Sequence, residues 1–170
     1  MANLIWITGL SGSGKTTIGK ELYKQLKLKY VNYIFLDGDS FREIFGNDLR
    51  HTQKDRFENA MRIHRMCLFL LSQEINVICA TMSLYKEIHE LNRRKIETYF
   101  EVFIECSREE LIKRNQKGLY TAAIEGDRDD VVGISLPFDM PLNCELIIDN
   151  SEKSDLQTKV AKILNLVGEN

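Results

Sequence analysis

One stretch near the start of the chain decides its fold: Gly9-Leu10-Ser11-Gly12-Ser13-Gly14-Lys15-Thr16-Thr17. It matches the pattern G-x4-G-K-[ST] in full, in which glycines let the backbone curl with its N–H groups pointing inward. The apolar, β-rich run from Leu4 to Thr8 precedes it, and apolar residues follow it at helical spacing, Ile18, Leu22 and Leu26. The sequence therefore predicts a strand, a loop that binds phosphate groups, and a helix.

Each part of this loop has an expected partner on a bound nucleotide. Lys15 is expected to place its charge near the β- and γ-phosphates, and Thr16 to offer its hydroxyl to Mg²⁺. The chain lacks the [NT]-K-x-D motif with which GTPases read guanine, which favours ATP. The alternative is a glycine-rich turn that ends in Lys-Thr by chance. The expected ATP-binding residues in the loop are Gly9, Ser11, Gly12, Ser13, Gly14, Lys15, Thr16 and Thr17.

The rest of the chain alternates apolar runs with helical patterns. Further strands are expected at Tyr33 to Leu36, Ile75 to Thr81, Glu101 to Cys106 and Glu145 to Ile148, with a long helix from about Gln53 and a closing helix that stops at Gly168. This alternation predicts an α/β fold: a parallel five-stranded sheet with helices on both faces, in a single domain over residues 1–170. Residues of about 117–143, with three glycines and both prolines, are expected to form an irregular lid.

Composition limits the partners. The 170 residues carry a net charge of −2 with a pI near 6.0, which argues against a nucleic-acid-binding protein but permits a local pocket for a small anion. The four cysteines form no CxxC pair and are expected to be free thiols. No apolar stretch reaches the ~20 residues of a membrane span, so we expect a cytoplasmic protein without a membrane partner; a homodimer stays open.

Two further clusters point to a reaction crevice. Asp37 and Asp39 end the second expected strand, and in open α/β sheets ligands bind beyond the carboxyl ends of the strands. A carboxylate there can accept the proton of an attacking hydroxyl or hold a metal; the alternative is an Asp-Gly turn. On the long helix, Arg56 and Asn59 share a face, which would aim a cation and an amide together into the crevice. The alternative is a salt-bridged surface, because Glu58 and Arg62 in the same stretch form an i, i+4 pair.

The remaining polar residues have plainer interpretations. Of the three histidines only His51 has a functional interpretation, and His64 and His89 show no metal-ligand spacing. Lys86, Arg93 and Arg94 are expected on a solvated helix face.

Taken together, the motifs resemble one family over nearly the whole chain. That family is the adenylyl-sulfate (APS) kinases, which phosphorylate the 3′-hydroxyl of adenylyl sulfate with Mg-ATP. GLSGSGKTT is similar to its phosphate loop, LDGDSFR to its L-D-G-D-N-x-R and DRFENAMR to its D-R-x-E-N-x-R-R. Further along, SLY at 83–85 resembles S-P-Y, RNQKGLY at 114–120 resembles R-D-P-K-G-L-Y, and PFDMPLN at 137–143 resembles P-Y-E-x-P-x-N.

The resemblance implies a P-loop kinase fold, Mg²⁺ bound with ATP, and a role for each matched residue. Lys15 and Asp39 would be catalytic, Asp39 serving either the acceptor hydroxyl or, with Thr16, the metal. Arg42, Arg56 and Asn59 would grip the phosphate-anhydride end of the acceptor, and Arg114 would lie over the ATP base. The acceptor-binding residues implied in this way are Asp37, Arg42, His51, Arg56, Asn59, Ser83, Lys117, Gly118, Leu119 and Val131.

Two departures from the family pattern bear on the acceptor. Where the family has phenylalanines that sandwich the acceptor adenine, this chain has His51 and Val131. Base–aromatic stacking contributes about 1–3 kcal/mol per ring, so purine binding should weaken about tenfold or more. The expected acceptor is therefore cytidine diphosphoramidate, which a branch of the family uses in capsule phosphoramidate biosynthesis. An adenylyl-sulfate kinase with a degenerate pocket is the alternative, and a nucleotide-dependent switch is the alternative from another class.

Overall fold

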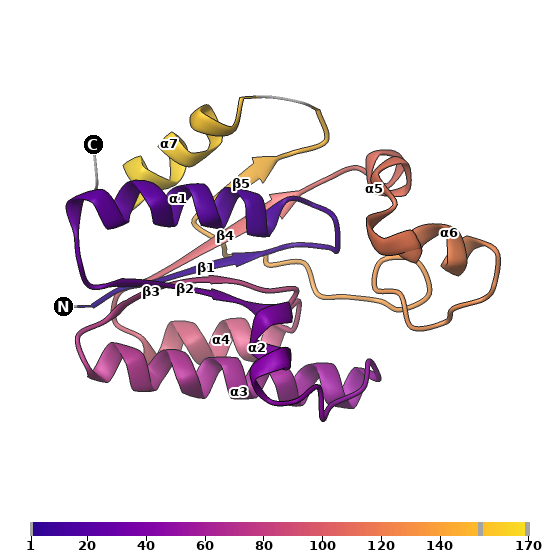
Figure 1. The fold of residues 1–170 in the computed structure, drawn as a ribbon, viewed down its shortest axis with the longest axis horizontal. Coiled ribbons are helices and arrows are strands. Elements are labelled where there is room, and N and C mark those ends of the chain that lie inside the picture. The colour runs from indigo at the N-terminus through magenta and orange to yellow at the C-terminus, as the bar shows by residue number, and fades with distance from the viewer. Residues whose placement is uncertain (1, 153–154, 169–170) are drawn as a thin grey trace.

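The computed structural model describes residues 2–152 and 155–168 of the chain. In this part of the chain five strands form one parallel sheet in the order β2-β3-β1-β4-β5 (Figure 1). The parallel five-stranded sheet predicted from the sequence is confirmed. The strands are β1 (Leu4–Thr8), β2 (Tyr33–Asp37), β3 (Asn76–Ala80), β4 (Tyr99–Glu105) and β5 (Leu146–Asp149).

Helices cover both faces of the sheet, which explains the uninterrupted apolar runs of the central strands. In β1, Ile5 and Ile7 pack under α1 (Lys15–Lys29) and α7 (Leu156–Leu166). Leu4 and Trp6 alternate to the other face, against α3 (Gln53–Ser72) and α4 (Lys86–Lys95). Figure 1 shows the two helix layers on either side of the sheet.

The region beyond the carboxyl ends of the strands is more helical than expected. It contains α2 (Gly38–Ile44), α5 (Arg108–Arg114), a 3-10 turn (Gln116–Gly118) and α6 (Leu119–Ile124), so the lid is irregular only from about residue 125 onward. These helices are too short for a 3.6-residue period to stand out. Their caps carry the signal instead: Ser107 accepts a hydrogen bond from the Glu110 amide at the start of α5.

Two further features concern the cysteines and the helices. All four cysteines are free, with Cys67 and Cys79 buried in the core and Cys106 and Cys144 half-buried. Over the described ranges, no helix combines the length and the apolar character that a membrane span requires.

Candidate active site

The loop between β1 and α1 has the backbone that its glycines permit. Gly14 adopts φ +103° at the start of α1, and a Cβ there would collide with the Asn150 side chain. At Gly9, φ is +150° and a Cβ would stand 2.5 Å from the carbonyl oxygen of Ile104. Side chains are therefore excluded at both positions, which keeps the loop tight against the sheet.

Two side chains of the loop are fixed before any ligand arrives. Lys15 Nζ donates to the Leu10 carbonyl at 2.8 Å, so the ammonium group lies over the loop. Burial lowers the pKa of Lys15 to about 8, against the opposing effects of Asp39 and Asp37. The Thr16 hydroxyl donates to Asp37 Oδ2 at 2.7 Å.

The two aspartates after β2 differ in what they contact. Asp37 Oδ1 accepts the amides of Asp39 and Ser40 at 3.0 and 3.4 Å and so caps α2, while its Oδ2 accepts from Thr16. The Asp39 side chain is 77% exposed and forms an ion pair at 3.1 Å with Nζ of Lys117, in the lid. Asp37 therefore has a structural place, and the Asp39 carboxylate is accessible to a ligand.

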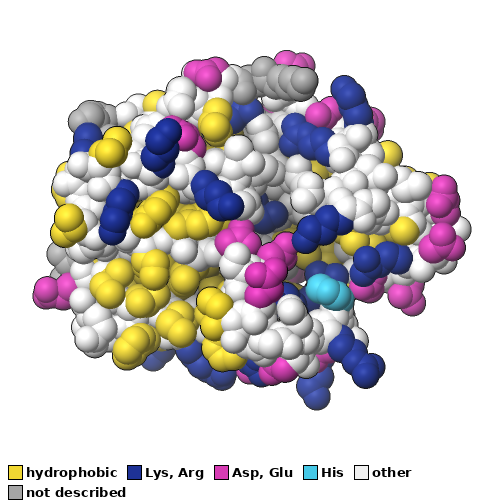
Figure 2. All heavy atoms as spheres, in the orientation of Figure 1, with side chains coloured by type: hydrophobic (Ala, Val, Ile, Leu, Met, Phe, Trp, Pro, Cys, Tyr) yellow, Lys and Arg dark blue, Asp and Glu magenta, His cyan; other side chains and the backbone are white. Residues whose placement is uncertain are grey.

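Two cavities meet at Lys15. One, of about 430 Å³, lies on the α7 side and is lined by the loop, Arg114, Gln116, Asn150 and Lys159. The other, of about 260 Å³, lies toward the lid and is lined by Asp37, Asp39, His51, Lys117, Leu119, Arg128 and Val132. In Figure 2, basic, acidic and histidine side chains gather where the lid meets the main body. The geometry suits two ligands that approach Lys15 from opposite sides.

Arg114, the last residue of α5, joins the segment that precedes the lid to the phosphate loop. Its guanidinium donates to the carbonyls of Gly12 at 3.1 Å and Asn150 at 2.6 Å, and Glu110 accepts from its Nε. The amide of Asn150 in turn donates to the Ser13 carbonyl at 2.6 Å. Asn150 directly follows β5, at the sheet edge where ligands bind, and that position was the available sequence signal for it.

A pocket of about 80 Å³ continues from the lid-side cavity and gathers cations. Arg42, Arg56, Asn59 and Ser83 line it, together with His51. Arg56 donates to the carbonyls of His51 and Asp130, and Arg42 to those of Leu49 and Arg50. Among the described residues, no carboxylate lies within ion-pair distance of either guanidinium. Two half-buried cations without an anionic partner suit an anionic ligand.

The structure brings together most of the residues expected for the acceptor, with two exceptions. Val131 is 1% exposed and packs with Leu111 and Tyr120, while Val132 lines the cavity. The carbonyl of Val131 accepts three amides of a tight turn, from Ile134, Ser135 and Leu136, and this turn points the Val131 side chain inward. Gly118, at φ +69°, directly precedes α6 and lines none of these cavities.

Sequence reasoning missed Arg128, which lines the lid-side cavity. Asp130 accepts from its Nε at 2.8 Å and from its Nη2 at 2.7 Å. Arg56 holds the same segment through the Asp130 carbonyl. A lone Arg-x-Asp in a polar loop carries no sequence signal of this arrangement.

Comparison with known proteins identifies the family. The family model "Adenylylsulphate kinase" matches residues 1–149. The "Cytidine diphosphoramidate kinase" of Campylobacter jejuni subsp. jejuni serotype O:2 is 46% identical over 161 residues, which cover 95% of this chain and 94% of the relative. The "Probable adenylyl-sulfate kinase" of Aeropyrum pernix is 33% identical, with 96% and 91% covered.

A solved structure agrees in fold over nearly the full length. The Mycobacterium tuberculosis APS kinase in complex with AMPPNP and APS superposes with a TM-score of 0.86 at 28% identity, covering 98% of each chain. The chain therefore belongs to the adenylyl-sulfate kinase family, whose members transfer a phosphoryl group to a hydroxyl acceptor.

Proposed function

We propose that this kinase transfers the γ-phosphoryl group of ATP to the 3′-hydroxyl of cytidine diphosphoramidate. One observation carries the choice of acceptor: among the described residues that line the lid-side cavity, His51 has the only ring. Burial and the charges of Arg56 and Arg42 lower the pKa of His51, so this ring is neutral near pH 7. A neutral imidazole supplies one aromatic ring on which a base can stack. A purine would need a second ring, and Val132, which also lines the cavity, has none.

The wall of this cavity also suits a pyrimidine. Arg128 has its guanidinium plane fixed by Asp130, and cytosine presents O2 as an acceptor to such a donor. The similarity to the Campylobacter enzyme, which is higher than to the Aeropyrum one, supports the same choice. The alternative, an adenylyl-sulfate kinase, is favoured by the family model and by the other relatives.

On the donor side, we propose that the ATP phosphates lie in the loop of residues 9–17 and its base in the larger cavity beside Arg114. Lys15 then places its charge on the β- and γ-phosphates, where charge develops during transfer. On the acceptor side, Arg42, Arg56 and Asn59 bind the anhydride tail, and Asp39 accepts the proton of the attacking hydroxyl. Lys117 holds Asp39 from the lid, which we place at residues 117–143 of a single domain.

The residues around Thr16 fit Mg²⁺ held jointly with ATP. Among the described residues, no group of three or more His, Cys, Asp or Glu could hold a metal ion. Mg²⁺ prefers oxygen ligands and keeps several waters, so one hydroxyl and nearby carboxylates suffice when phosphates complete the shell. Thr16 and Asp39 would hold the ion, which would neutralise phosphate charge. We also place the enzyme in the cytoplasm, where its donor ATP is available.

Acceptor dependence of ATP consumption tests the proposal. ADP release is followed with Mg-ATP alone and with adenylyl sulfate, cytidine diphosphate or cytidine diphosphoramidate. We expect the largest stimulation with cytidine diphosphoramidate and a product carrying a 3′-phosphate. A nucleotide-dependent switch would instead hydrolyse ATP slowly and at a rate indifferent to every acceptor, and that result would overturn the assignment.

A double substitution tests the cavity wall. The double variant His51→Phe with Val132→Phe places two aromatic rings beside the proposed position of the base. It should raise kcat/KM for adenylyl sulfate relative to the cytidine acceptor by roughly one to three orders of magnitude. The matched control is His51→Phe with Val131→Phe, because Val131 is buried and a larger ring there should overpack the core at a cost of about 1–3 kcal/mol. If both double variants change preference equally, the cavity is not the base site.

The lowered pKa of Lys15 predicts how ATP affinity depends on pH. Bound phosphates favour the charged ammonium, so above pH 8 the complex holds more protons than the free protein. Affinity for ATP should therefore be constant below pH 8 and fall by up to about tenfold per pH unit above it. Calorimetric titrations at several pH values measure this. Lys15→Arg keeps its charge throughout, so its affinity should not depend on pH in this range.

A further inference from the structure

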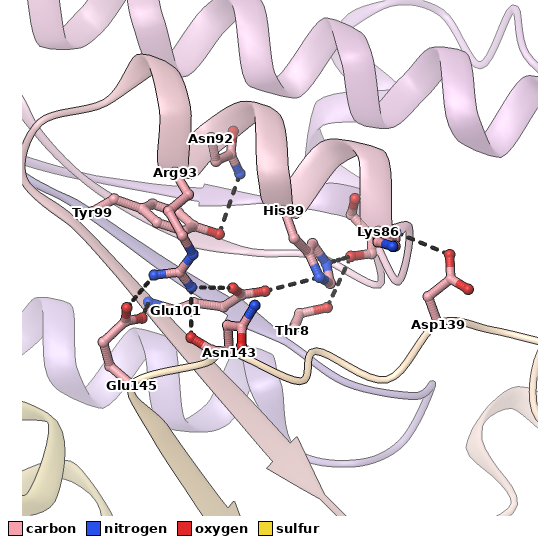
Figure 3. A network of polar contacts seen from close by, with 11 residues as sticks. Thr8, Lys86, His89, Asn92, Arg93, Tyr99, Glu101, Asp139, Asn143 and Glu145 are labelled. Atoms are coloured by element: carbon pink, nitrogen blue, oxygen red, sulfur yellow. Dashed lines mark hydrogen bonds and ion pairs between the residues drawn. The ribbon is translucent and has the colours of Figure 1, made fainter.

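Behind the acceptor pocket, a buried histidine contacts two hydrogen-bond acceptors. His89 on α4 is 6% exposed, and its Nε2 lies 2.6 Å from the carbonyl oxygen of Ser83. Its Nδ1 lies 2.9 Å from Oε1 of Glu101 on β4, which is 1% exposed. Figure 3 shows the His89 ring facing the carboxylate of Glu101, with a dashed line between them.

These contacts fix the protonation of the ring. A neutral imidazole carries one N–H, so one of its nitrogens would point a lone pair at a carbonyl or carboxylate oxygen. Oε1 of Glu101 is buried and has no hydrogen-bond partner among the described residues, so the ion pair with Nδ1 of His89 is the contact that can compensate its charge, and an uncompensated buried carboxylate oxygen is costly. We infer that His89 is held as the imidazolium and that, as a positioning residue, it fixes Ser83 for the tail of the acceptor.

The surrounding charges balance an imidazolium. Arg93 donates to Glu101 Oε2 at 2.9 Å and pairs with Glu145, whose other oxygen accepts the Glu101 amide at 2.7 Å. Two cations, His89 and Arg93, thus face two carboxylates. Burial alone would lower the pKa of His89, but the hydrogen bond and charge of Glu101, with help from Ser83 and Asp139, raise it above the ordinary value. Arg93 lies on the exposed face of its helix, as expected, and is also part of this network.

Other polar and charged groups lie around the network. From α3, His64 Nδ1 lies 2.6 Å from the Asn92 side-chain oxygen. On α4 itself, Lys86 and Glu90 pair with each other at the surface. From the segment before β5, Asp139 accepts the Lys86 amide at 2.9 Å (Figure 3). Among the described residues, Glu101 is therefore the one carboxylate within ion-pair distance of His89.

The network ends at Ser83, a residue that lines the acceptor pocket and whose hydroxyl is buried behind it. The Ser83 carbonyl accepts from both His89 and the Thr8 hydroxyl of β1, the latter at 3.2 Å. With its peptide held from two sides, Ser83 presents a side chain that is 2% exposed and whose Oγ has no hydrogen-bond partner among the described residues. Arg42, Arg56 and Asn59 line the same pocket. An oriented, unpaired hydroxyl beside two cations suits an oxygen or nitrogen of the anhydride tail.

This inference rests on the proposed function only in that the acceptor tail occupies this pocket; it does not depend on the base. The pH profile tests it, measured with whichever acceptor is turned over best. In the wild type, measured with saturating ATP, deprotonation of His89 at high pH should release Ser83 and raise the acceptor KM roughly 5- to 20-fold with little change in kcat. The fall in ATP affinity above pH 8 belongs to Lys15 and should be the same in the wild type and in His89→Gln. His89→Gln should show the raised KM at every pH, and His89→Arg should keep the low KM at high pH.

A second measurement reads His89 directly. Nitrogen-15 NMR of the imidazole, in protein without acceptor, should show both ring nitrogens protonated at pH 7. His64→Gln is the matched control, because it removes another buried histidine that bonds to the same helix and should leave the acceptor KM and its pH profile unchanged. A single protonated nitrogen at pH 7, or a pH profile that survives in His89→Gln, would overturn the inference. The NMR measurement uses protein without acceptor, so it remains valid if cytidine diphosphoramidate is not a substrate. Failure of the proposed function and failure of this inference are therefore distinguishable.

Discussion

Lys15→Ala should abolish turnover while the protein stays folded. Lys15 is the ammonium group held over the phosphate loop, at the point where the two cavities meet. Its charge offsets the charge that develops on the transferred phosphoryl group. Removing a preorganised charge of this kind lowers kcat by at least about 10³-fold, or ~4 kcal/mol of transition-state stabilisation.

Single-turnover rates with saturating ATP and acceptor measure this loss. Lys20→Ala is the matched control, because Lys20 lies exposed on the same helix and should leave the rate unchanged. Circular dichroism and thermal unfolding check that the Lys15 variant is folded. Near-normal turnover in a folded Lys15→Ala protein would contradict the placement of the phosphates in this loop.

Asp39→Asn should lower kcat by roughly 10²–10⁴-fold. The substitution keeps the shape of the side chain but removes its charge and its basicity. The fold should tolerate it, because the cap of α2 and the hydrogen bond to Thr16 both belong to Asp37. What is lost is the carboxylate that reaches the ligand side of the cavity and pairs with Lys117.

The kinetic constants locate the effect. Steady-state measurements should show a fall in kcat with the KM for ATP nearly unchanged, and Glu43→Gln, an exposed acid on the same helix, should behave as the wild type. If the affinity for nucleotide changed and kcat did not, Asp39 would be a binding residue. The roles of Asp39 and Lys117 would then have to be separated by removing the lysine as well.

The phosphate loop and the sheet could be predicted because their signals are local. The loop is a run of consecutive residues in which backbone geometry demands glycine, and β1 is apolar from Leu4 to Ile7 because both of its faces are buried. The crevice followed from Asp37 and Asp39, since the ends of parallel strands lie along one edge. These inferences need no knowledge of how distant segments pack.

The parts that could not be predicted depend on such packing. Whether Val131 or Val132 faces the cavity is set by one turn in the lid, because a shift of one residue reverses the side-chain direction. His89 and Glu101 meet only because α4 packs on the face of the sheet to which Glu101 points, and neither residue has a sequence signal. Arg93 is exposed, as expected, but its ion pairs had no sequence signal for the same reason: both of its carboxylate partners come from other elements.

The choice of acceptor is tested most directly by competition in one tube. Cytidine diphosphoramidate and adenylyl sulfate are mixed in equal amounts with limiting Mg-ATP, and the two 3′-phosphorylated products are separated and counted, which gives the ratio of the two kcat/KM values. We predict at least about a tenfold excess of the cytidine product, because the cavity offers one ring where a purine needs two. An excess of the adenylyl-sulfate product would contradict the account.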